Sequence, residues 1–370
     1  MNTTEKLNIL LVVPRLNIGG AESYVITTAL GLKAEGYQVT VASWGGQLTR
    51  KLRAAGISHY LVPIRFNPTL AAQMLTRIIK RCNIDIVHAN SAAAGIAALK
   101  ACRKLGKILV YTAHGVFGHN LQEKSLEQAD MIICVSDFLK QRSIAMGIAP
   151  HKLTTVYSGI DVTQFNPSAV IKEKVRQEFG IGKDDFVVGI VARIKNLRDK
   201  GHQDLLELLK HYPAQTSNRK LLVIGKGQGL AALQSAVRKL GLTNQVILAG
   251  HRVDIPIVMQ ALDCLVLPSV FETFGLVLIE AMALSIPVIA YAVGGTPEAI
   301  EDGVTGFLVP KGDIGAMNDK LNLLSADQAL RYRMGVNGRA RVLAYFNSKQ
   351  MLERLLAIYH QLYKEKVNYD

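Results

Sequence analysis

The chain has 370 residues, which is too long for one ordinary hydrophobic core, so two domains are expected. A hydrophobic fraction of 49% with 19% charged residues excludes a disordered chain. The formal net charge of +14 points to anionic partners, and the four cysteines stand alone in apolar segments, which argues against a disulfide framework or a cysteine metal site.

The first apolar segment of the chain, Leu7 to Val13, stops at Pro14 and Arg15. It is shorter than the apolar region of an export signal and is typical of a first strand. We expect no export signal and no membrane-spanning helix, and therefore a cytoplasmic protein.

Strand-like and helix-like segments alternate in the first half of the chain. Strands are predicted at 8–13, 38–42, 58–62, 84–87, 107–112 and 131–135, with a helix from about Gly20 to Glu35 after the first. This alternation predicts an α/β fold with a mainly parallel, doubly wound sheet, in which ligands gather at the carboxyl ends of the strands.

Turn-forming residues cluster at 158–167, the predicted linker, and a second alternation follows it. Its strands are predicted at 186–191, 220–224, 245–248, 263–267 and 287–291, and three helical stretches close the chain. We therefore predict a domain at 1–165, a second Rossmann-like domain at 166–346, and a last helical segment at 347–370. Two such domains facing each other would leave a cleft.

The segment from Phe271 to Ala283, FETFGLVLIEAMA, is the most informative one. Apolar residues at helical spacing predict a helix that begins near Thr273 to Gly275, with Glu272 in the preceding loop and Glu280 about two turns inside. The N–H groups of the helix terminus suit a phosphate, and the two carboxylates suit hydroxyls at either end of a nucleotide sugar. Two glutamates at this spacing also occur by chance, but a carboxylate in so apolar a segment is costly unless it is hydrogen-bonded.

Gly19 and Gly20 follow the first strand where a helix begins, so their backbone N–H groups can approach a phosphate. The alternative is tight packing alone. The GxGxxG spacing and acidic residue of a dinucleotide site are missing, which argues against a nicotinamide enzyme.

Five further residues follow predicted strands. His114 is the second residue after the strand at 107–112. His88 is a weaker candidate of the same kind, and both could equally be structural. Arg193 and Lys200 bracket the loop after the strand at 186–191, where two cations can neutralise a diphosphate as it leaves. Arg252 belongs to the rim where a base or phosphate could lie.

Basic residues concentrate in the first half, on apparent amphipathic helices. Such a face can meet anionic lipid, or it can simply be solvated. Nucleic acid is the least favoured partner, because no recognition module or alternation of basic and aromatic residues is present.

These motifs together resemble the retaining glycosyltransferases of family 4. The similarity rests on GGAE after the first strand, AR…KGH at the start of the second domain, FETFGLVLIEAMA, and GGTPEAIEDGVTGFLV, and it covers Leu7 to about Phe346. The resemblance implies the GT-B fold, with two Rossmann-like domains facing across a cleft, and transfer of sugar with retention of configuration and without a metal ion. No DxD triplet occurs in the chain.

The resemblance also implies roles for individual residues. His114 would sit at the reacting sugar, Arg193 and Lys200 at the diphosphate, and Gly19 and Gly20 at the phosphates or the acceptor. Glu272 would hold the donor sugar and Glu280 the ribose. The donor-binding residues would be Gly19, Gly20, Arg193, Lys200, Arg252, Glu272, Thr273, Phe274, Gly275, Leu276 and Glu280. The loop between Arg193 and Lys200 departs from the family pattern by about one extra residue, and Ser158 replaces a common asparagine.

We therefore expect a hexose or N-acetylhexosamine to pass from a nucleotide-diphosphate sugar, with a UDP-sugar favoured, to an envelope glycan or lipid-linked acceptor. No cofactor and no metal are expected, whereas an anionic membrane surface is a candidate partner. The rivals are a nucleotide-sugar epimerase, a glycan phosphorylase, and a catalytically silent binding subunit.

Overall fold

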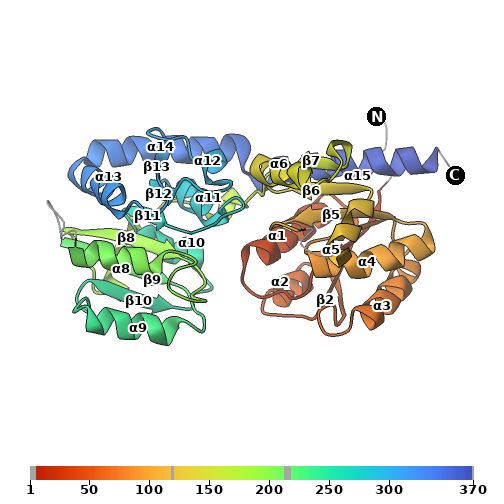
Figure 1. Ribbon diagram of the computed structural model, residues 1–370, viewed down its shortest axis with the longest axis horizontal. Helices are drawn as coiled ribbons and strands as arrows, with labels where there is room; N and C mark the ends of the chain where they lie inside the picture. The colour runs from red at the N-terminus through yellow and green to blue at the C-terminus, as the bar shows by residue number, and fades with distance from the viewer. Residues whose placement is uncertain (1–5, 118–120, 212–217, 369–370) are drawn as a thin grey trace. The chain divides into compact units, whose positions relative to one another are not determined.

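The computed structural model describes residues 6–117, 121–211 and 218–368. These residues form two compact units, shown in Figure 1. The first comprises 1–161 together with 347–370, and the second comprises 162–346, so the chain returns to the first unit for its last helix. The boundary at 161/162 lies inside the turn-rich segment 158–167.

The first unit is built on a seven-stranded sheet in the order β3-β2-β1-β4-β5-β6-β7, and every neighbouring pair is parallel. Its strands are β1 (Asn8–Val12), β2 (Gln38–Ser43), β3 (Ser58–Leu61), β4 (Ile86–Ala89), β5 (Ile108–Ala113), β6 (Met131–Cys134) and β7 (Leu153–Thr155). Its helices are α1 (Gly20–Ala34), α2 (Thr49–Ala54), α3 (Pro68–Arg81), α4 (Ala92–Leu105), α5 (Leu121–Lys124), α6 (Asp137–Ala145) and α15 (Ser348–Val367).

Strand β1 shows why this sheet is covered on both faces. All four residues from Ile9 to Val12 are buried, as expected for a central parallel strand. Alternate side chains point to opposite faces, and Ile9 and Leu11 belong to the apolar cluster that includes Leu32 of α1 and Leu355 of α15. The last helix therefore completes the core of the first unit.

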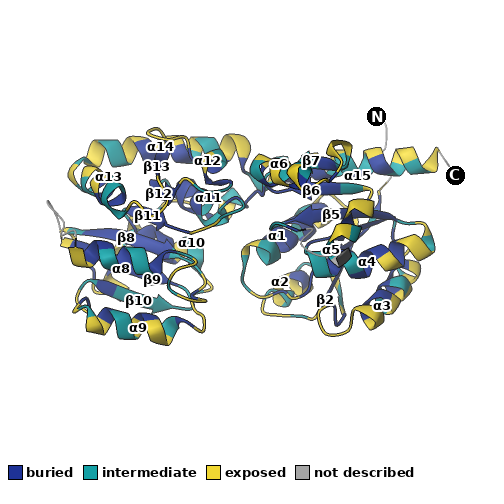
Figure 2. Cartoon of the chain, viewed as in Figure 1, coloured by how far each residue is buried: buried dark blue, intermediate teal, exposed yellow. Residues whose placement is uncertain are grey.

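The second unit is built on a six-stranded parallel sheet in the order β10-β9-β8-β11-β12-β13. Its strands are β8 (Asp185–Val191), β9 (Asn218–Ile224), β10 (Val246–Gly250), β11 (Cys264–Leu267), β12 (Val288–Tyr291) and β13 (Gly306–Val309). Its helices are α7 (Ala169–Glu178), α8 (His202–His211), α9 (Leu230–Lys239), α10 (Ile255–Val258), α11 (Leu276–Ala283), α12 (Thr296–Ala299), α13 (Ile314–Ala326) and α14 (Gln328–Tyr345). In Figure 2 the strands are mostly buried, whereas the helices also carry exposed residues.

The predicted α/β class with two doubly wound parallel sheets is confirmed. Two short strands, β7 and β13, were missed, because each has only three or four residues and no clear alternation. The predicted strand at 84–87 lies at 86–89 instead, so His88 is inside β4 and does not follow it.

Each sheet has one place where the strand order reverses direction. This topological switch point lies between β1 and β4 in the first sheet and between β8 and β11 in the second. In open parallel sheets, ligands bind beyond the carboxyl ends of the two strands at this point. The loops after β1, β4, β8 and β11 are therefore the positions that the fold favours for a site. Over the described residues, no helix is both long and apolar enough to span a membrane.

Candidate active site

The loops after β8 and β11 are packed directly on each other in the second unit. The Val270 N–H donates to the Asp199 carbonyl oxygen over 3.1 Å. Gly201 has a φ of +72°, and a Cβ added there would lie 2.1 Å from the Pro268 carbonyl oxygen. Only glycine allows this approach without strain. The two loops at the switch point therefore pack closely, backbone against backbone.

Lys200 and Glu272 meet across these two loops. The Lys200 Nζ donates to Glu272 Oε1, and the buried Ser269 hydroxyl donates to the same oxygen over 2.8 Å. The Glu272 side chain is 13% exposed and the Lys200 side chain 32%. Within the part of the chain that the structure describes, Oε2 accepts no hydrogen bond, so it remains available for the hydroxyl of a ligand.

Helix α11 begins close to this ion pair. Its N-cap is Gly275, at φ 90° and ψ 63°, and no side chain caps its first turn. Phe274 is buried and packs edge-on against Phe346 with ring centroids 5.3 Å apart, which fixes the entry of the chain into the helix. The terminus therefore presents uncapped backbone N–H groups, the arrangement that favours an anion.

Glu280 lies on the same helix, but closer to its start than predicted. Because α11 begins at Leu276, Glu280 is its fifth residue, just over one turn inside, and the predicted two turns were wrong. Its side chain is largely buried, and desolvation raises the pKa of the carboxyl to about 7. A carboxyl group of this kind gains most from a ligand whose hydroxyls donate hydrogen bonds to it.

The two predicted arginines differ in how they are held. Arg193 is exposed, two residues after the end of β8, and forms no hydrogen bond or ion pair with the other described residues. Arg252 instead forms a bidentate pair with Asp254, at 2.8 and 2.7 Å, and also contacts Glu178. Two carboxylates hold Arg252 to its own unit, so Arg193 is the cation better placed to meet a ligand.

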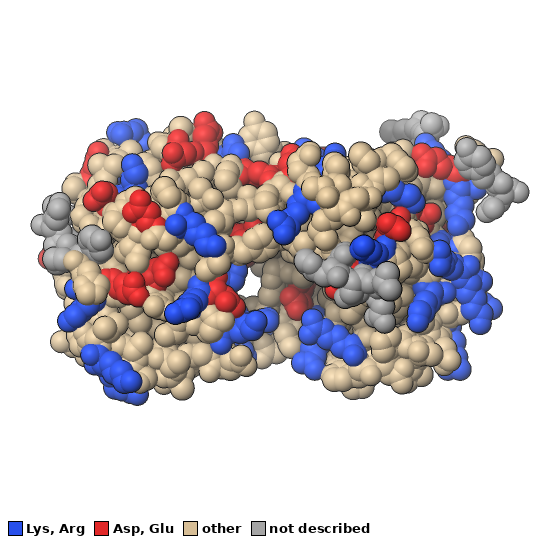
Figure 3. All heavy atoms as spheres, in the orientation of Figure 1, with Lys and Arg blue, Asp and Glu red and all other residues tan. Residues whose placement is uncertain are grey.

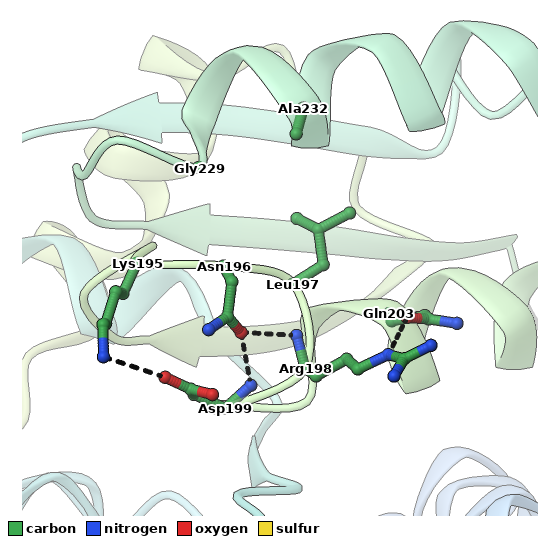
Figure 4. Close-up of a pocket in the computed structure, with 8 residues that line it drawn as sticks. All are labelled: Lys195, Asn196, Leu197, Arg198, Asp199, Gln203, Gly229 and Ala232. Atoms are coloured by element: carbon green, nitrogen blue, oxygen red, sulfur yellow. Dashed lines mark hydrogen bonds and ion pairs between the residues drawn. The ribbon is translucent and has the colours of Figure 1, made fainter.

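A pocket of about 450 Å³ lies on the other flank of the loop after β8 (Figure 4). The Asn196 side chain shapes this loop by accepting hydrogen bonds from the backbone N–H groups of Arg198 and Asp199. The lining residues are Lys195, Asn196, Leu197, Arg198, Asp199, Gln203, Gly229 and Ala232. Neither Lys200 nor Glu272 lines the pocket, so it is separate from the ion pair.

In the first unit, the predicted residues gather at the carboxyl edge of the sheet. Gly19 is the N-cap of α1 and Gly20 its first residue, and no side chain caps the helix there. One turn further along, Tyr24 packs edge-on against His114, with ring centroids 4.8 Å apart. The His114 Nε2 lies 3.5 Å from the Asn90 Oδ1 at the end of β4. Burial lowers the pKa of His114 to about 4, so the ring is neutral at pH 7.

His88 has a structural role. It is fully buried, its Nδ1 lies 2.5 Å from the Tyr359 hydroxyl, and its Nε2 lies 2.6 Å from the Thr112 hydroxyl. Burial lowers its pKa to about 3. The ring therefore connects β4 and β5 to α15 and does not reach a ligand.

Sequence reasoning missed two residues at these sites, Ser269 and Asn90. Ser269 follows β11 by two residues, and Asn90 follows β4 directly. Both are polar residues at the end of a buried strand, which is the signal that would have found them. Asn90 was missed because the strand boundary was placed two residues too early.

Comparison with solved structures identifies the class of fold. A glycosyltransferase from Rickettsia africae superposes with a TM-score of 0.86 at 25% identity, covering 96% of this chain and 98% of that one. The Anabaena protein HepE, solved with UDP and glucose, has a TM-score of 0.85 at 24% identity, covering 95% of this chain and 99% of its own. The two parallel-sheet units are therefore those of the GT-B glycosyltransferase fold.

Sequence comparison identifies the family. Residues 18–164 match Glycosyltransferase Family 4, and residues 171–341 match Glycosyl transferases group 1. A capsular polysaccharide biosynthesis glycosyltransferase, CapM, of Staphylococcus aureus is 32% identical over 76% of this chain and 77% of its own. An N-acetyl-alpha-D-glucosaminyl L-malate synthase of Bacillus anthracis is 29% identical over 80% of each chain. This protein belongs to glycosyltransferase family 4 and is a glycosyltransferase.

Proposed function

We propose that this protein is a retaining, metal-independent glycosyltransferase. It moves a hexose or N-acetylhexosamine from a nucleotide-diphosphate sugar to a glycan or lipid-linked acceptor of the cell envelope. The observation that carries the proposal is the Lys200–Glu272 pair at the switch point of the second sheet, next to the uncapped terminus of α11. Cation, carboxylate and helix terminus there match the parts of such a donor.

Each group has a distinct role in this proposal. Lys200 and Arg193 neutralise the diphosphate together with the first N–H groups of α11, which begins at Leu276. Glu272 accepts a hydrogen bond from the donor sugar through Oε2, and Glu280 accepts hydrogen bonds from the ribose. In the first unit, neutral His114 contacts the sugar hydroxyls near the reacting carbon, and Gly19 and Gly20 border the acceptor.

The transfer step exchanges one bond for another at the anomeric carbon of the donor. The bond from this carbon to the diphosphate oxygen breaks, and the acceptor hydroxyl oxygen bonds to the carbon on the same face. The hydroxyl proton leaves with the diphosphate. Negative charge grows on the departing diphosphate, so fixed cations and backbone N–H groups lower the barrier without a metal ion. We therefore expect turnover to survive a chelator such as EDTA.

The relatives guide the choice of substrates. Two of the relatives are the capsular polysaccharide glycosyltransferase and the N-acetylglucosaminyl malate synthase described above. A third is a D-inositol 3-phosphate glycosyltransferase of Mycobacterium tuberculosis, which is 27% identical over 93% of this chain and 79% of its own. We place UDP-sugars first because the Anabaena neighbour was solved with UDP and glucose. All four cysteines are free thiols, as is usual in a reducing compartment such as the cytoplasm.

The proposal is tested by binding first and by turnover second. A thermal-shift screen with UDP-, GDP- and ADP-sugars should raise the melting temperature with one nucleotide class, because a ligand of the folded state stabilises it. Lys200→Ala and Glu272→Ala should both remain folded and lose transfer. Full turnover in either variant would remove the role assigned to that residue. Product analysis with and without an acceptor separates transfer from epimerisation or phosphorolysis.

We also propose that the protein works at an anionic membrane surface, because it carries 43 Lys and Arg against 29 Asp and Glu. Figure 3 shows Lys and Arg side chains on the face of the first unit that is in view. Near an anionic leaflet each such residue contributes about 1 kcal/mol of attraction. A merely solvated basic surface would show no vesicle binding at low salt.

A further inference from the structure

An exposed apolar cluster lies at the carboxyl edge of the first sheet. Trp44, the only tryptophan in the chain, is 47% exposed and follows β2 directly. Phe66 is 60% exposed and follows β3. Its ring packs edge-on against the Trp44 ring, with ring centroids 5.5 Å apart. Leu61 is 59% exposed beside Gly45, and Leu70 is 40% exposed in the first turn of α3. We call these four residues the aromatic edge.

The backbone beneath the aromatic edge is fixed. The Trp44 N–H donates to the Pro14 carbonyl oxygen over 3.0 Å, and the Val62 N–H donates to the Ser43 carbonyl oxygen over 2.9 Å. A Cβ added to Gly46 would lie 2.4 Å from the carbonyl oxygen of Leu16, so these loops pack backbone against backbone. The large apolar side chains are therefore held in water by rigid loops, which marks an interaction surface.

The charge around the aromatic edge has one sign. The segment from residue 44 to residue 67, which joins β2 to α3 through β3, contains four Lys or Arg and no Asp or Glu. Arg15 lies over the Phe66 ring, 5.4 Å from its centroid. Three more exposed cations, Arg50, Lys51 and Arg53, are on α2, which begins five residues after Trp44.

The acids that flank this basic stretch lie at the opposite edge of the sheet. Glu35 is the C-cap of α1, just before β2 begins, and Asp85 accepts a hydrogen bond from the Asn8 N–H at the start of β1. The loops after β1, β2 and β3, at residues 13–19, 44–48 and 62–67, contain no acid, and Glu22 in the first turn of α1 is the nearest one in sequence to the first of them.

We propose that the aromatic edge docks on a membrane surface rich in anionic lipid. Trp44, Phe66, Leu61 and Leu70 enter the interfacial region, and Arg15 with the cations of α2 meets the headgroups. Tryptophan favours this region because its ring is apolar with one hydrogen-bond donor, and basic residues attract the anionic leaflet. The loops also expose Asn17 and Gln47, but the aromatic edge itself is apolar and the charged side chains of the loops, Arg15 and Arg65, are basic, which favours an anionic lipid surface over a soluble sugar.

This docking site rests on the membrane part of the proposed function and gives it a location. The aromatic edge and His114 belong to the same edge of the same sheet, because both follow the carboxyl ends of parallel strands. Docking would therefore bring a lipid-linked acceptor to the side of the first unit where His114 and Gly20 lie. Binding of the nucleotide sugar, which the second unit carries, does not depend on it.

The single tryptophan provides the test. Full-length protein is mixed with vesicles of phosphatidylcholine, with or without phosphatidylglycerol, at low and high salt. Trp44 emission should shift to the blue with the anionic vesicles alone, and the shift should weaken at high salt because the cations are screened. An unchanged emission with anionic vesicles at low salt would overturn the proposal, as would a blue shift with a soluble glycan and none with vesicles.

Two sets of variants separate the contribution of the apolar residues to vesicle binding from that of the basic residues. Binding is measured by vesicle sedimentation. Leu61→Ser with Phe66→Ser should lower partitioning at least tenfold, because about 0.8 kcal/mol is lost for each buried methylene equivalent. Replacing Arg50, Lys51 and Arg53 with Gln should lower it by about fivefold per residue. The control is Val253→Ser with Tyr332→Ser, two equally exposed apolar residues of the second unit, 61% and 74% exposed. Equal losses in the control would overturn the proposal.

These results remain distinct from those that test the proposed transferase. The Leu61→Ser, Phe66→Ser variant should keep the thermal shift with a nucleotide sugar, because it changes no residue of the second unit. Lost vesicle binding with an intact thermal shift therefore confirms the docking surface. Absent vesicle binding by the native protein, with an intact thermal shift, removes the docking surface and leaves the transferase in place.

Discussion

Ser269 shows what a single buried hydroxyl contributes to the site. Ser269 and Lys200 both donate a hydrogen bond to Oε1 of Glu272, which leaves Oε2 without a partner among the described residues. Ser269→Ala should lower kcat/KM about tenfold, since one hydrogen bond to a charged group is worth about 1.5 kcal/mol. If Glu272 contacts the donor sugar as proposed, Ser269→Ala should weaken binding of the UDP-sugar but not of UDP. Calorimetry with both ligands measures this difference.

The matched control for Ser269 is Ser143→Ala. Ser143 is also buried and also donates one hydrogen bond, to the Leu139 carbonyl oxygen within α6 of the first unit. The Ser143→Ala variant should lose about as much stability as Ser269→Ala and keep the affinity of the native protein for UDP and the UDP-sugar. Equal losses of UDP and UDP-sugar binding in Ser269→Ala would show that Ser269 only supports the fold.

Glu280 predicts a pH dependence. Burial raises its pKa from 4.5 to about 7, so the folded state binds this proton more tightly than the unfolded chain. Its contribution to the free energy of unfolding is thus fully present below pH 4.5 and is lost as the pH rises through 7, by up to about 3 kcal/mol. Denaturant unfolding measures the free energy of unfolding of the native protein and of Glu280→Gln. The difference between the two should show this loss between pH 4.5 and 8.

Ligand binding should show the opposite trend at the same residue. If Glu280 accepts hydrogen bonds from the ribose as a carboxylate, UDP affinity should rise between pH 6 and 8 in the native protein and stay level in Glu280→Gln. A parallel pH dependence in both proteins would place the ribose elsewhere.

Helix α11 depends on a glycine at its first turn. Gly275 has φ +90°, and a Cβ there would lie 2.9 Å from the Leu278 Cδ1. Gly275→Ala should cost about 1–2 kcal/mol from the left-handed conformation alone, and it should also weaken UDP binding by shifting the helix terminus. Gly303→Ala is the control, because it has φ +75° with nothing within 4 Å. It should lose stability without losing affinity.

Helix α15 is fixed to the first unit by a buried polar contact. Tyr359→Phe removes the hydroxyl that meets His88 and leaves a buried ring nitrogen without its partner, at a cost of about 1–3 kcal/mol in the free energy of unfolding. Tyr332→Phe, at a tyrosine that is 74% exposed, should change stability by less than about 0.5 kcal/mol. Equal unfolding midpoints for both variants would contradict this role.

The elements that sequence reasoning predicted best are those whose signal is local. The buried strands β1, β8 and β11 are nearly continuous apolar runs, and Lys200 and Glu272 were selected because each lies near such a strand's end. The register of β4 could not be predicted, because His88 is polar and is buried only through partners 24 and 271 residues away. The same limit applies in part to Arg252, whose partner Asp254 is two residues away but whose other partner, Glu178, is 74 residues away.

At the scale of the whole molecule, each unit has one set of candidate functional groups at the carboxyl edge of its sheet. The second unit carries the ion pair, the uncapped helix terminus and a carboxyl group of raised pKa, and the first carries a neutral histidine and the aromatic edge. This division predicts that donor binding and membrane docking respond to different substitutions. It also makes the second unit the place where the central claim is tested.

That claim is that fixed cations at the loop after β8 bind the diphosphate of the donor. The most direct measurement is calorimetric titration of UDP and of uridine into the native protein, Lys200→Ala and Lys195→Ala. Lys195 is the matched control, because it lies on the same loop and contacts Asp199 at 3.9 Å. We predict that the native protein and Lys195→Ala prefer UDP over uridine by at least tenfold, and that Lys200→Ala loses most of this preference. An equal preference in all three proteins would contradict the account.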